Sequence, residues 1–274
     1  PMTEYEGFAA LERDGWTNPA IADGYVTRFA RASDMAVPAV VAAVPVGARV
    51  LDLCCGQGNV SAALHSAGFE VAGADFSPQM LSHARARIPE VDFIEADAQD
   101  LPFPDGSFDA VTCSFGLIHV PDQPRALAEV ARVLTPGGTF AMTVWCGPDR
   151  SAAFSTLYPA VMQNADPSVQ MPDQPDFHRF ANEDTASEIL TEAGLELARH
   201  EVVPCHFDLD APQELAEIFQ HGAPRGGSLM SRQPPENLAA IKAAMAAKVR
   251  DSFAHGDRWQ VDIPAALAVA NKAG

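Results

Sequence analysis

Basic residues are scarce in this sequence: 18 Lys and Arg stand against 36 Asp and Glu, which gives a formal net charge of −18. Such a surface repels the phosphate backbone of nucleic acids, and no cluster of Lys or Arg offsets that charge locally. Long apolar runs are missing too, because none approaches the roughly 20 residues of a membrane span. The first residues also lack the charged-then-apolar pattern of a signal peptide. We therefore expect neither a nucleic-acid partner nor a membrane span.

Cysteine is rare and odd in number, with five residues at positions 54, 55, 113, 146 and 205. An odd set, of which three lie in or beside apolar runs, favours reduced thiols in a cytoplasmic protein over a disulfide framework. The spaced Cys and His pairs of a zinc site are absent, so we expect no metal. What is present in abundance is apolar sequence, 47% of 274 residues, enough for a large core.

Strand and helix patterns alternate from residue 48 onward, which predicts a doubly wound α/β fold with a mostly parallel sheet of seven strands. Helices at 4–13 and 19–44 precede this pattern, and residues 1–45 form an N-terminal helical cover. We interpret residues 146–182 and 210–256 as lid insertions in a single domain of residues 1–274, with a loop at 222–235. The seven predicted strands are 48–53, 69–74, 91–96, 108–114, 139–145, 195–209 and 258–271; the predicted helices are 58–67, 77–87, 121–134, 151–164, 183–193, 212–221 and 236–253.

The chain is organised around residues 49–61, where an apolar strand runs into a turn with Gly56 and Gly58 and then into a helix. Asp52 lies inside the apolar run, and a buried carboxylate there requires a positive or hydrogen-bonding partner. The turn does not match the G-x-G-x-x-G fingerprint of dinucleotide sites, because Ser61 stands at the third glycine position. A Walker loop is excluded as well, since no G-K-[ST] follows. The ligand that remains is an adenosine compound without phosphates.

Carboxylates follow the next two strands, at the edge where open parallel sheets bind ligands. Asp75 ends the second strand, where it suits the two hydroxyls of a ribose. It could instead cap the next helix, but Ser77 is the better cap. Asp97 ends the third strand and suits the amine of an adenine ring held between Phe76 and Ala98, although taken alone it is better explained as a solvated loop carboxylate.

Five segments in this order resemble the class I S-adenosylmethionine-dependent methyltransferases, of the small-molecule type related to the ubiquinone/menaquinone methyltransferases. The resemblance covers residues 16–145 and implies a Rossmann-like fold that uses S-adenosylmethionine and releases S-adenosylhomocysteine. Cys54 departs from the family, which usually has a small residue, often Gly, at its place. The segments are Val50–Gly58, Asp75–Leu81, Asp97–Phe103, Phe108–Asp122 and Leu134–Gly138.

The resemblance also implies a set of cofactor contacts. The amino-acid end of the cofactor would rest on the glycine turn, with Asp52 near its ammonium and Tyr25 near its carboxylate. Met80 would contact the adenine, and His119 would line the boundary between cofactor and acceptor. The full set implied is Tyr25, Asp52, Cys54, Cys55, Gly56, Gly58, Asn59, Asp75, Phe76, Met80, Asp97, Ala98, Ser114, Phe115 and His119.

Substrate contacts would come from the N-terminal helices and the two insertions. The candidates are Trp16, Trp145, Tyr158, His178, Phe180 and Phe219. A hydroxyl acceptor needs a base within hydrogen-bond reach, for which we name His119, His178, His206 and His221, with His119 as the catalytic candidate. An amine or activated-carbon acceptor needs none. The acceptor atom stays open, as does the choice between monomer and homodimer.

Three uses of the cofactor remain open at this point: methyl transfer to a small molecule, another reaction on the same scaffold such as a cyclisation, and binding without catalysis. All three share the same cofactor contacts, so the residues alone do not separate them.

Overall fold

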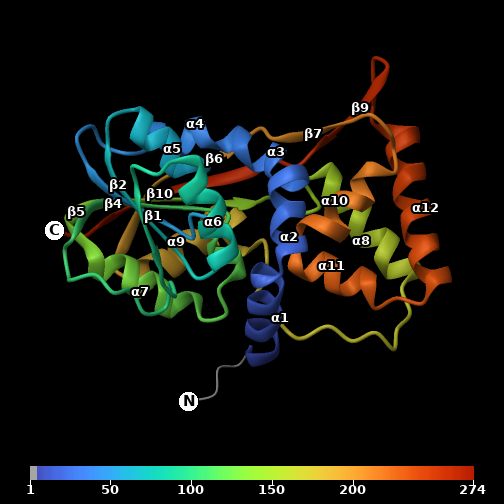
Figure 1. Ribbon diagram of the computed structural model, residues 1–274, viewed down its shortest axis with the longest axis horizontal. Coiled ribbons are helices and arrows are strands. Elements are labelled where there is room, and N and C mark those ends of the chain that lie inside the picture. The colour runs from blue at the N-terminus through green and yellow to red at the C-terminus, as the bar shows by residue number, and fades with distance from the viewer. Residues whose placement is uncertain (1–4) are drawn as a thin grey trace.

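The computed structural model describes residues 5–274 and is built around a seven-stranded sheet (Figure 1). The strand order is β3-β2-β1-β4-β5-β10-β6, and only β10 runs antiparallel to its neighbours. The order reverses between β1 and β4, which makes that pair the topological switch point. The predicted doubly wound, mostly parallel sheet is therefore confirmed. Its strands are β1 (Arg49–Leu53), β2 (Glu70–Asp75), β3 (Asp92–Glu95), β4 (Phe108–Ser114), β5 (Leu134–Trp145), β6 (Leu195–Val203) and β10 (Ala265–Lys272).

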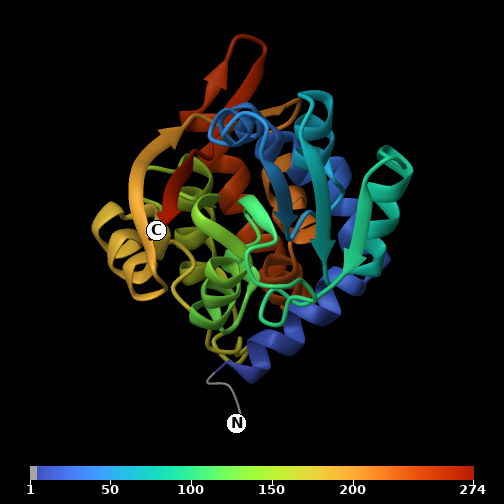
Figure 2. The same cartoon turned by 90° about the vertical axis from the view of Figure 1, so that its left-hand side faces the viewer.

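The crossover helices begin and end where local chemistry places them. The Ser77 hydroxyl accepts from the Met80 amide at 3.1 Å, so the predicted cap is confirmed. Gly68, with φ +88°, follows the helix before β2 as expected for a C-terminal glycine. The helices that cover the two faces of the sheet (Figure 2) are α5 (Asn59–Ser66), α6 (Pro78–Arg87), α7 (Gln123–Val133) and α9 (Glu183–Glu192), with the 3₁₀ turns η3 (Leu117–His119) and η4 (Arg179–Ala181).

The N-terminal cover is segmented, where the sequence predicted one helix over 19–44. The Asn18 side chain accepts from the Ala20 amide at 2.9 Å and caps the second helix. A π-helical turn then widens the backbone, a deviation often found at functional sites. The predicted start of the first helix at residue 4 lies outside the described residues. The segments are α1 (Glu6–Thr17), α2 (Pro19–Gly24), η1 (Tyr25–Phe29), α3 (Ala30–Ser33), η2 (Asp34–Ala36) and α4 (Val37–Ala42).

Two predicted strands are each divided by a proline. Pro204 separates β6 from β7 (His206–Leu209), and Pro264 separates β9 (Arg258–Asp262) from β10. Because proline has no amide hydrogen to donate, the ladder is interrupted there and the chain passes into a second sheet. That sheet has the order β7-β9-β8, with β8 at Ala254–His255.

A group of helices lies beyond the N-terminal cover, on the right of Figure 1: α8 (Ala152–Asn164), α10 (Glu214–Gly222), α11 (Pro224–Ser231) and α12 (Pro235–Ser252). The loop predicted at 222–235 is wrong, because α11 occupies most of it. The sequence pattern did not indicate this helix because Gly226 and Gly227 have low helix propensity. Here they allow close packing: a Cβ at either glycine would meet a carbonyl oxygen of α10, at 2.6 Å and 2.7 Å. No helix within residues 5–274 is long and apolar enough to cross a membrane.

Candidate active site

The turn after β1 holds three residues in the left-handed region: Cys54 and Gly56 with φ 53°, and Gly58 with φ 78°. The Gly56 amide donates to Asp75 at 2.9 Å and the Cys55 amide donates to the Ala74 carbonyl at 3.1 Å, so the turn is fixed against the end of β2. A Cβ at Gly58 would lie only 3.1 Å from Ala84, so close packing against α6 favours glycine at this position.

Asp52 is buried in the middle of β1, and two hydroxyls supply the partners that a buried carboxylate requires. Ser61 donates to one carboxylate oxygen and Thr112 donates to the other, the latter at 3.0 Å. Burial nevertheless raises the pKa of Asp52 to about 6, against the opposing effect of these hydrogen bonds. Asp52 is therefore anchored on both sides and poorly solvated at the root of the turn.

Asp75 presents a buried carboxylate at the end of β2. Its oxygens accept from the amides of Ser77 and Gly56 at 2.8 Å and 2.9 Å, and burial raises its pKa in spite of these donors. Each oxygen keeps a further lone pair for a ligand hydroxyl. Asp97 lies at the next strand end, where the backbone and side-chain amides of Gln99 both donate to it at 2.9 Å. Two fixed acceptors thus stand on successive strand ends.

Glu12 on α1 joins two cavity residues from a nearly buried position. It accepts from Trp16 Nε1 at 3.0 Å and from His119 Nδ1 at 2.8 Å, and Glu12 is 3% exposed. The Trp16 ring meets the His119 ring edge-on, with 5.1 Å between ring centroids. The carboxylate fixes the orientation of the imidazole and leaves its Nε2 for the cavity.

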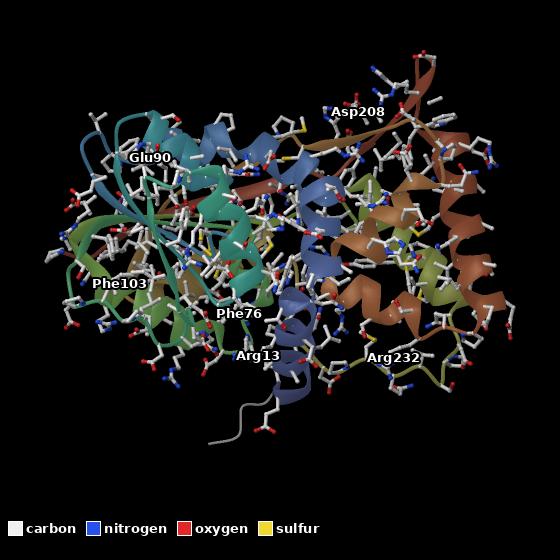
Figure 3. All side chains as sticks on the ribbon, in the orientation of Figure 1. Arg13, Phe76, Glu90, Phe103, Asp208 and Arg232 are labelled. Atoms are coloured by element: carbon white, nitrogen blue, oxygen red, sulfur yellow. The ribbon has the colours of Figure 1, made fainter. Side chains whose placement is uncertain are left out.

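Aromatic side chains form the wall between the sheet and the helices. Phe115, with φ 58°, stacks on Trp145 at 3.9 Å between ring centroids. Tyr25, on the π-helical turn, stacks on Phe29 at 5.8 Å and donates to Ser33 at 3.0 Å. Arg13 lies over Phe76 at 5.8 Å, where α1 meets the sheet (Figure 3).

These features surround one cavity of about 680 Å³. It joins the strand ends of the sheet to the space between Trp145 and the helices α8, α10 and α11. Most residues expected from the sequence line it. Those implied for the cofactor are Tyr25, Asp52, Cys54, Cys55, Gly56, Asn59, Asp75, Phe76, Met80, Asp97, Ala98, Ser114, Phe115 and His119; those proposed for the substrate are Trp16, Trp145, Tyr158 and Phe219.

Three expected residues do not line the cavity. Gly58 packs behind the turn, as described above. Phe180 is 1% exposed in the core, where it cannot contact a substrate. His178 lies behind the wall: its Nδ1 donates to the Trp145 carbonyl at 2.9 Å, and its Nε2 accepts from Tyr158 at 2.7 Å. Its pKa is lowered by burial.

The other two histidines named as bases also lie elsewhere. His206 is in β7, 3.5 Å from Asp208, and His221 is paired with Glu217 at 3.1 Å. Of the four candidates, His119 is the one whose ring lines the cavity.

The polar lining residues that sequence reasoning missed include Glu12, Gln174 and Arg225. For Glu12 a signal existed, because it stands one helical turn before Trp16 and so shares its face. Arg225 was missed with its helix, and nothing local distinguishes Gln174.

The cysteines of the turn are thiols. All five cysteines are free. The pKa of Cys54 lies well above its usual range because of its contact with the Cys113 thiol and its burial, and burial also raises that of Cys55. Neither is therefore an activated thiolate. Within the described part of the chain, no group of three or more His, Cys, Asp or Glu residues is placed to hold a metal ion.

The sheet order, the glycine turn at the switch point and the acceptor at the end of β2 match what the resemblance to the class I S-adenosylmethionine-dependent methyltransferases implied. Residues 51–142 match a protein-family model described as "Methyltransferase domain". The resemblance found in the sequence is thus confirmed, and S-adenosylmethionine is the cofactor of this class.

The chain is also similar to particular methyltransferases. The chain is 41% identical over 153 residues to a demethylmenaquinone methyltransferase of Renibacterium salmoninarum, covering 56% of this chain and 62% of the relative. It is 46% identical over 125 residues to the enzyme of the same name from Thermus thermophilus, covering 43% and 56%. The chain therefore spans less than two thirds of the length of these relatives. Among solved structures, a Bacillus halodurans protein described as a methyltransferase shares the fold with a TM-score of 0.57 and 24% identity, over 88% of this chain and all of that one.

Proposed function

We propose that this protein transfers the methyl group of S-adenosylmethionine to a small-molecule acceptor and releases S-adenosylhomocysteine. The observation that carries the proposal is the continuity of the cavity, which joins the acceptors on the strand ends to an aromatic chamber. The names of the sequence relatives favour methyl transfer over another reaction or mere binding. A net charge of −18 supports a small acceptor over a nucleic acid. Five free thiols support a cytoplasmic location.

The residues present fit the cofactor. Asp75 has lone pairs available for the ribose hydroxyls, and Asp97 would accept from the adenine amine beside Phe76 and Ala98. Asn59 Oδ1 is buried without a partner among the described residues and lines the cavity, so it suits the ammonium of the amino-acid end. Because Asp52 also lines the cavity, we assign it to the same ammonium, directly or through water.

When bound, S-adenosylmethionine supplies an activated methyl group on a sulfonium. The chain's own task is then to orient the acceptor and to exclude water, which provides most of the rate gain in such displacements. Phe115 and Trp145 form the flat surface against which the acceptor lies. For a hydroxyl acceptor, we assign His119 as the base and Glu12 as the residue that orients it. The insertions 146–182 and 210–256 act in this proposal as lids over the acceptor.

Binding of S-adenosylhomocysteine tests the cofactor assignment. Asp75→Ala removes two charged hydrogen bonds to the ribose, so we expect an affinity loss of about a hundredfold or more by calorimetry. Asp92→Ala is the matched control, because Asp92 is exposed at the opposite end of β3 from Asp97, and its affinity is expected to change less than about twofold. Unchanged affinity in the Asp75 variant contradicts the assignment.

The activity is tested by incubating the protein with S-adenosylmethionine that carries an isotope label in the methyl group, together with metabolite extracts. We expect a labelled small product, detected by its mass. Normal cofactor binding with no labelled product from varied extracts would contradict methyl transfer.

A further inference from the structure

The acceptor half of the cavity is aromatic. Phe154 is its centre, with Tyr158 at 5.3 Å, Phe219 at 5.7 Å and Phe177 at 6.0 Å between ring centroids. Tyr158 is 38% exposed and lines the cavity. Rings that meet at these distances offer faces and edges to a planar ligand.

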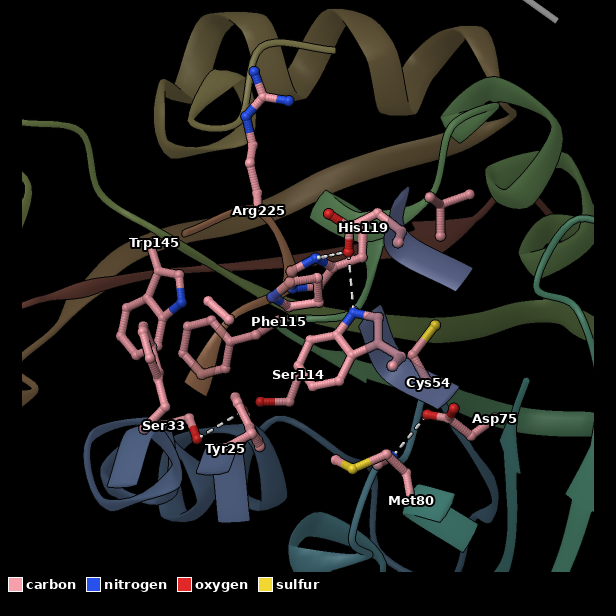
Figure 4. Close-up of a pocket in the computed structure, with 18 of the residues that line it drawn as sticks. Tyr25, Ser33, Cys54, Asp75, Met80, Ser114, Phe115, His119, Trp145 and Arg225 are labelled. Atoms are coloured by element: carbon pink, nitrogen blue, oxygen red, sulfur yellow. Dashed lines mark hydrogen bonds and ion pairs between the residues drawn. The ribbon is translucent and has the colours of Figure 1, made fainter. Parts of the chain in front are cut away.

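One charged side chain stands in this aromatic half. Among the lining residues described between positions 145 and 229, only Arg225 carries a formal charge. The cavity's carboxylates all come from earlier in the chain, on α1, η2 and the strand ends. Figure 4 shows the guanidinium of Arg225 pointing away from Cys54, Phe115 and His119. It therefore lies at the far end from the turn assigned to the amino-acid end of the cofactor.

The Arg225 guanidinium is not neutralised by the described residues. One of its five N–H groups donates to the Pro172 carbonyl at 2.9 Å, and no carboxylate of residues 5–274 forms an ion pair with it. Glu12 and Asp173 influence it through space, but Glu12 is already bound by Trp16 and His119. Burial lowers the pKa of Arg225, yet an arginine stays charged in proteins.

Arg225 stands on a rigid support. It follows Pro224, the first residue of α11, and a Cβ at Gly15 would lie 2.3 Å from the Pro224 side chain. This close contact fixes the start of α11 against α1. Gln174 also lines this part of the cavity, and its Oε1 is buried without a partner among the described residues. The chamber thus combines aromatic walls with a fixed cation and an unpaired hydrogen-bond acceptor in its lining.

We propose that the acceptor is a planar aromatic compound that carries a carboxylate, and that Arg225 binds this carboxylate at the end remote from the methyl-accepting atom. The inference rests on the proposed function, because it assigns the substrate class of the same cavity. A fork of N–H donors matches a carboxylate in two parallel hydrogen bonds. The bound anion also offsets the charge of Arg225 in a cavity that must admit a sulfonium.

Two isosteric probes test the proposal: 2-naphthoate, which is anionic, and 2-naphthamide, which is neutral. Their affinities are measured by calorimetry with and without saturating S-adenosylhomocysteine. The wild-type protein is expected to bind naphthoate at least about tenfold more tightly than naphthamide. In Arg225→Gln this preference is expected to fall below about twofold, because only naphthoate binding weakens.

Arg232→Gln is the matched control. Arg232 follows the same helix, is exposed (Figure 3), and donates a side-chain hydrogen bond to Met171 Sδ at 3.7 Å. It is expected to keep the wild-type preference. The proposal is overturned if wild type does not bind naphthoate, if it binds both probes equally, or if Arg225→Gln keeps the preference.

These outcomes are independent of the proposed function. S-adenosylhomocysteine affinity is measured for every variant, so loss of the naphthoate preference with normal S-adenosylhomocysteine binding contradicts the acceptor class alone. Failure to bind S-adenosylhomocysteine contradicts the proposed function, while the measurements without it still decide the role of Arg225.

Discussion

Asp52→Asn separates the cost of a buried charge from its use in binding. The substitution keeps the shape of the side chain, and an amide can still accept from one of Ser61 and Thr112 and donate to the other. What disappears is an ionisable carboxyl whose pKa is about 6 in the folded protein and about 4 in an unfolded chain.

The sign follows from proton linkage. Because the folded state binds the Asp52 proton more tightly than the unfolded state, ionisation favours unfolding, and the folded state loses stability as the pH rises from about 4 to about 6. Above that range the cost is complete. It amounts to roughly 1.5 kcal/mol at pH 5 and roughly 3 kcal/mol at pH 7.5. We expect Asp52→Asn to raise the free energy of unfolding by these amounts in the absence of ligand.

The affinity for the ligand should rise with pH, whereas the stability of the free protein falls. An ammonium beside Asp52 favours its ionised form, so binding releases a proton below pH 6. The wild-type affinity for S-adenosylhomocysteine is expected to rise by about tenfold between pH 5 and pH 7 from this group. Asp52→Asn should bind more weakly at pH 7 and lack this part of the pH dependence, while any contribution of Asp75 stays common to both proteins.

Urea unfolding at pH 5 and 7.5 and calorimetry across the same range measure both effects. The reasoning is refuted if Asp52→Asn is no more stable than wild type at pH 7.5, or if its stability gain does not grow with pH. Equal pH dependence of binding in the two proteins would refute the ammonium contact alone.

Two further substitutions test the cover and the base. Glu12→Gln should lower kcat for a hydroxyl acceptor by about ten- to a hundredfold with little change in KM, because the carboxylate that orients the base is lost. Glu6→Gln, on the exposed face of the same helix, is the control and should not lower kcat. Equal kinetics of the Glu12 variant and the wild type, measured with one acceptor, would exclude the role. Gly24→Ala should cost about 3 kcal/mol or more in urea unfolding, since its Cβ would lie 1.8 Å from the His221 carbonyl oxygen, whereas Gly47→Ala, with φ +78° and open space around it, should cost about 1 kcal/mol. Similar losses in both would contradict the packing argument.

The half of the site that we assign to the cofactor could be predicted from local sequence. The strand at 48–53, the glycines of the turn and the carboxylate of Asp75 are adjacent in sequence to the elements that position them, so period, turn chemistry and spacing were sufficient. The same holds for the helix cap at Ser77, whose bond is made three residues away.

The acceptor half depends on contacts between distant segments. Arg225 donates to the Pro172 carbonyl and is influenced through space by Glu12, and no periodicity in any of the three segments predicts these interactions. His178 and Phe180 fail for the same reason, since whether a side chain near a wall faces the cavity or the core is decided by packing. The divisions at Pro204 and Pro264 were visible as prolines, but their consequence, a second sheet, is tertiary.

The placement of the tryptophans gives the protein an internal optical reporter. Trp16 and Trp145 both line the cavity, whereas Trp259 lies in β9 of the small sheet. Indole emission responds to nearby charge and stacking. Trp259→Phe would therefore leave a protein whose tryptophan fluorescence arises only from the walls of the site, so that occupancy of the cavity can be followed without a dye or a labelled ligand.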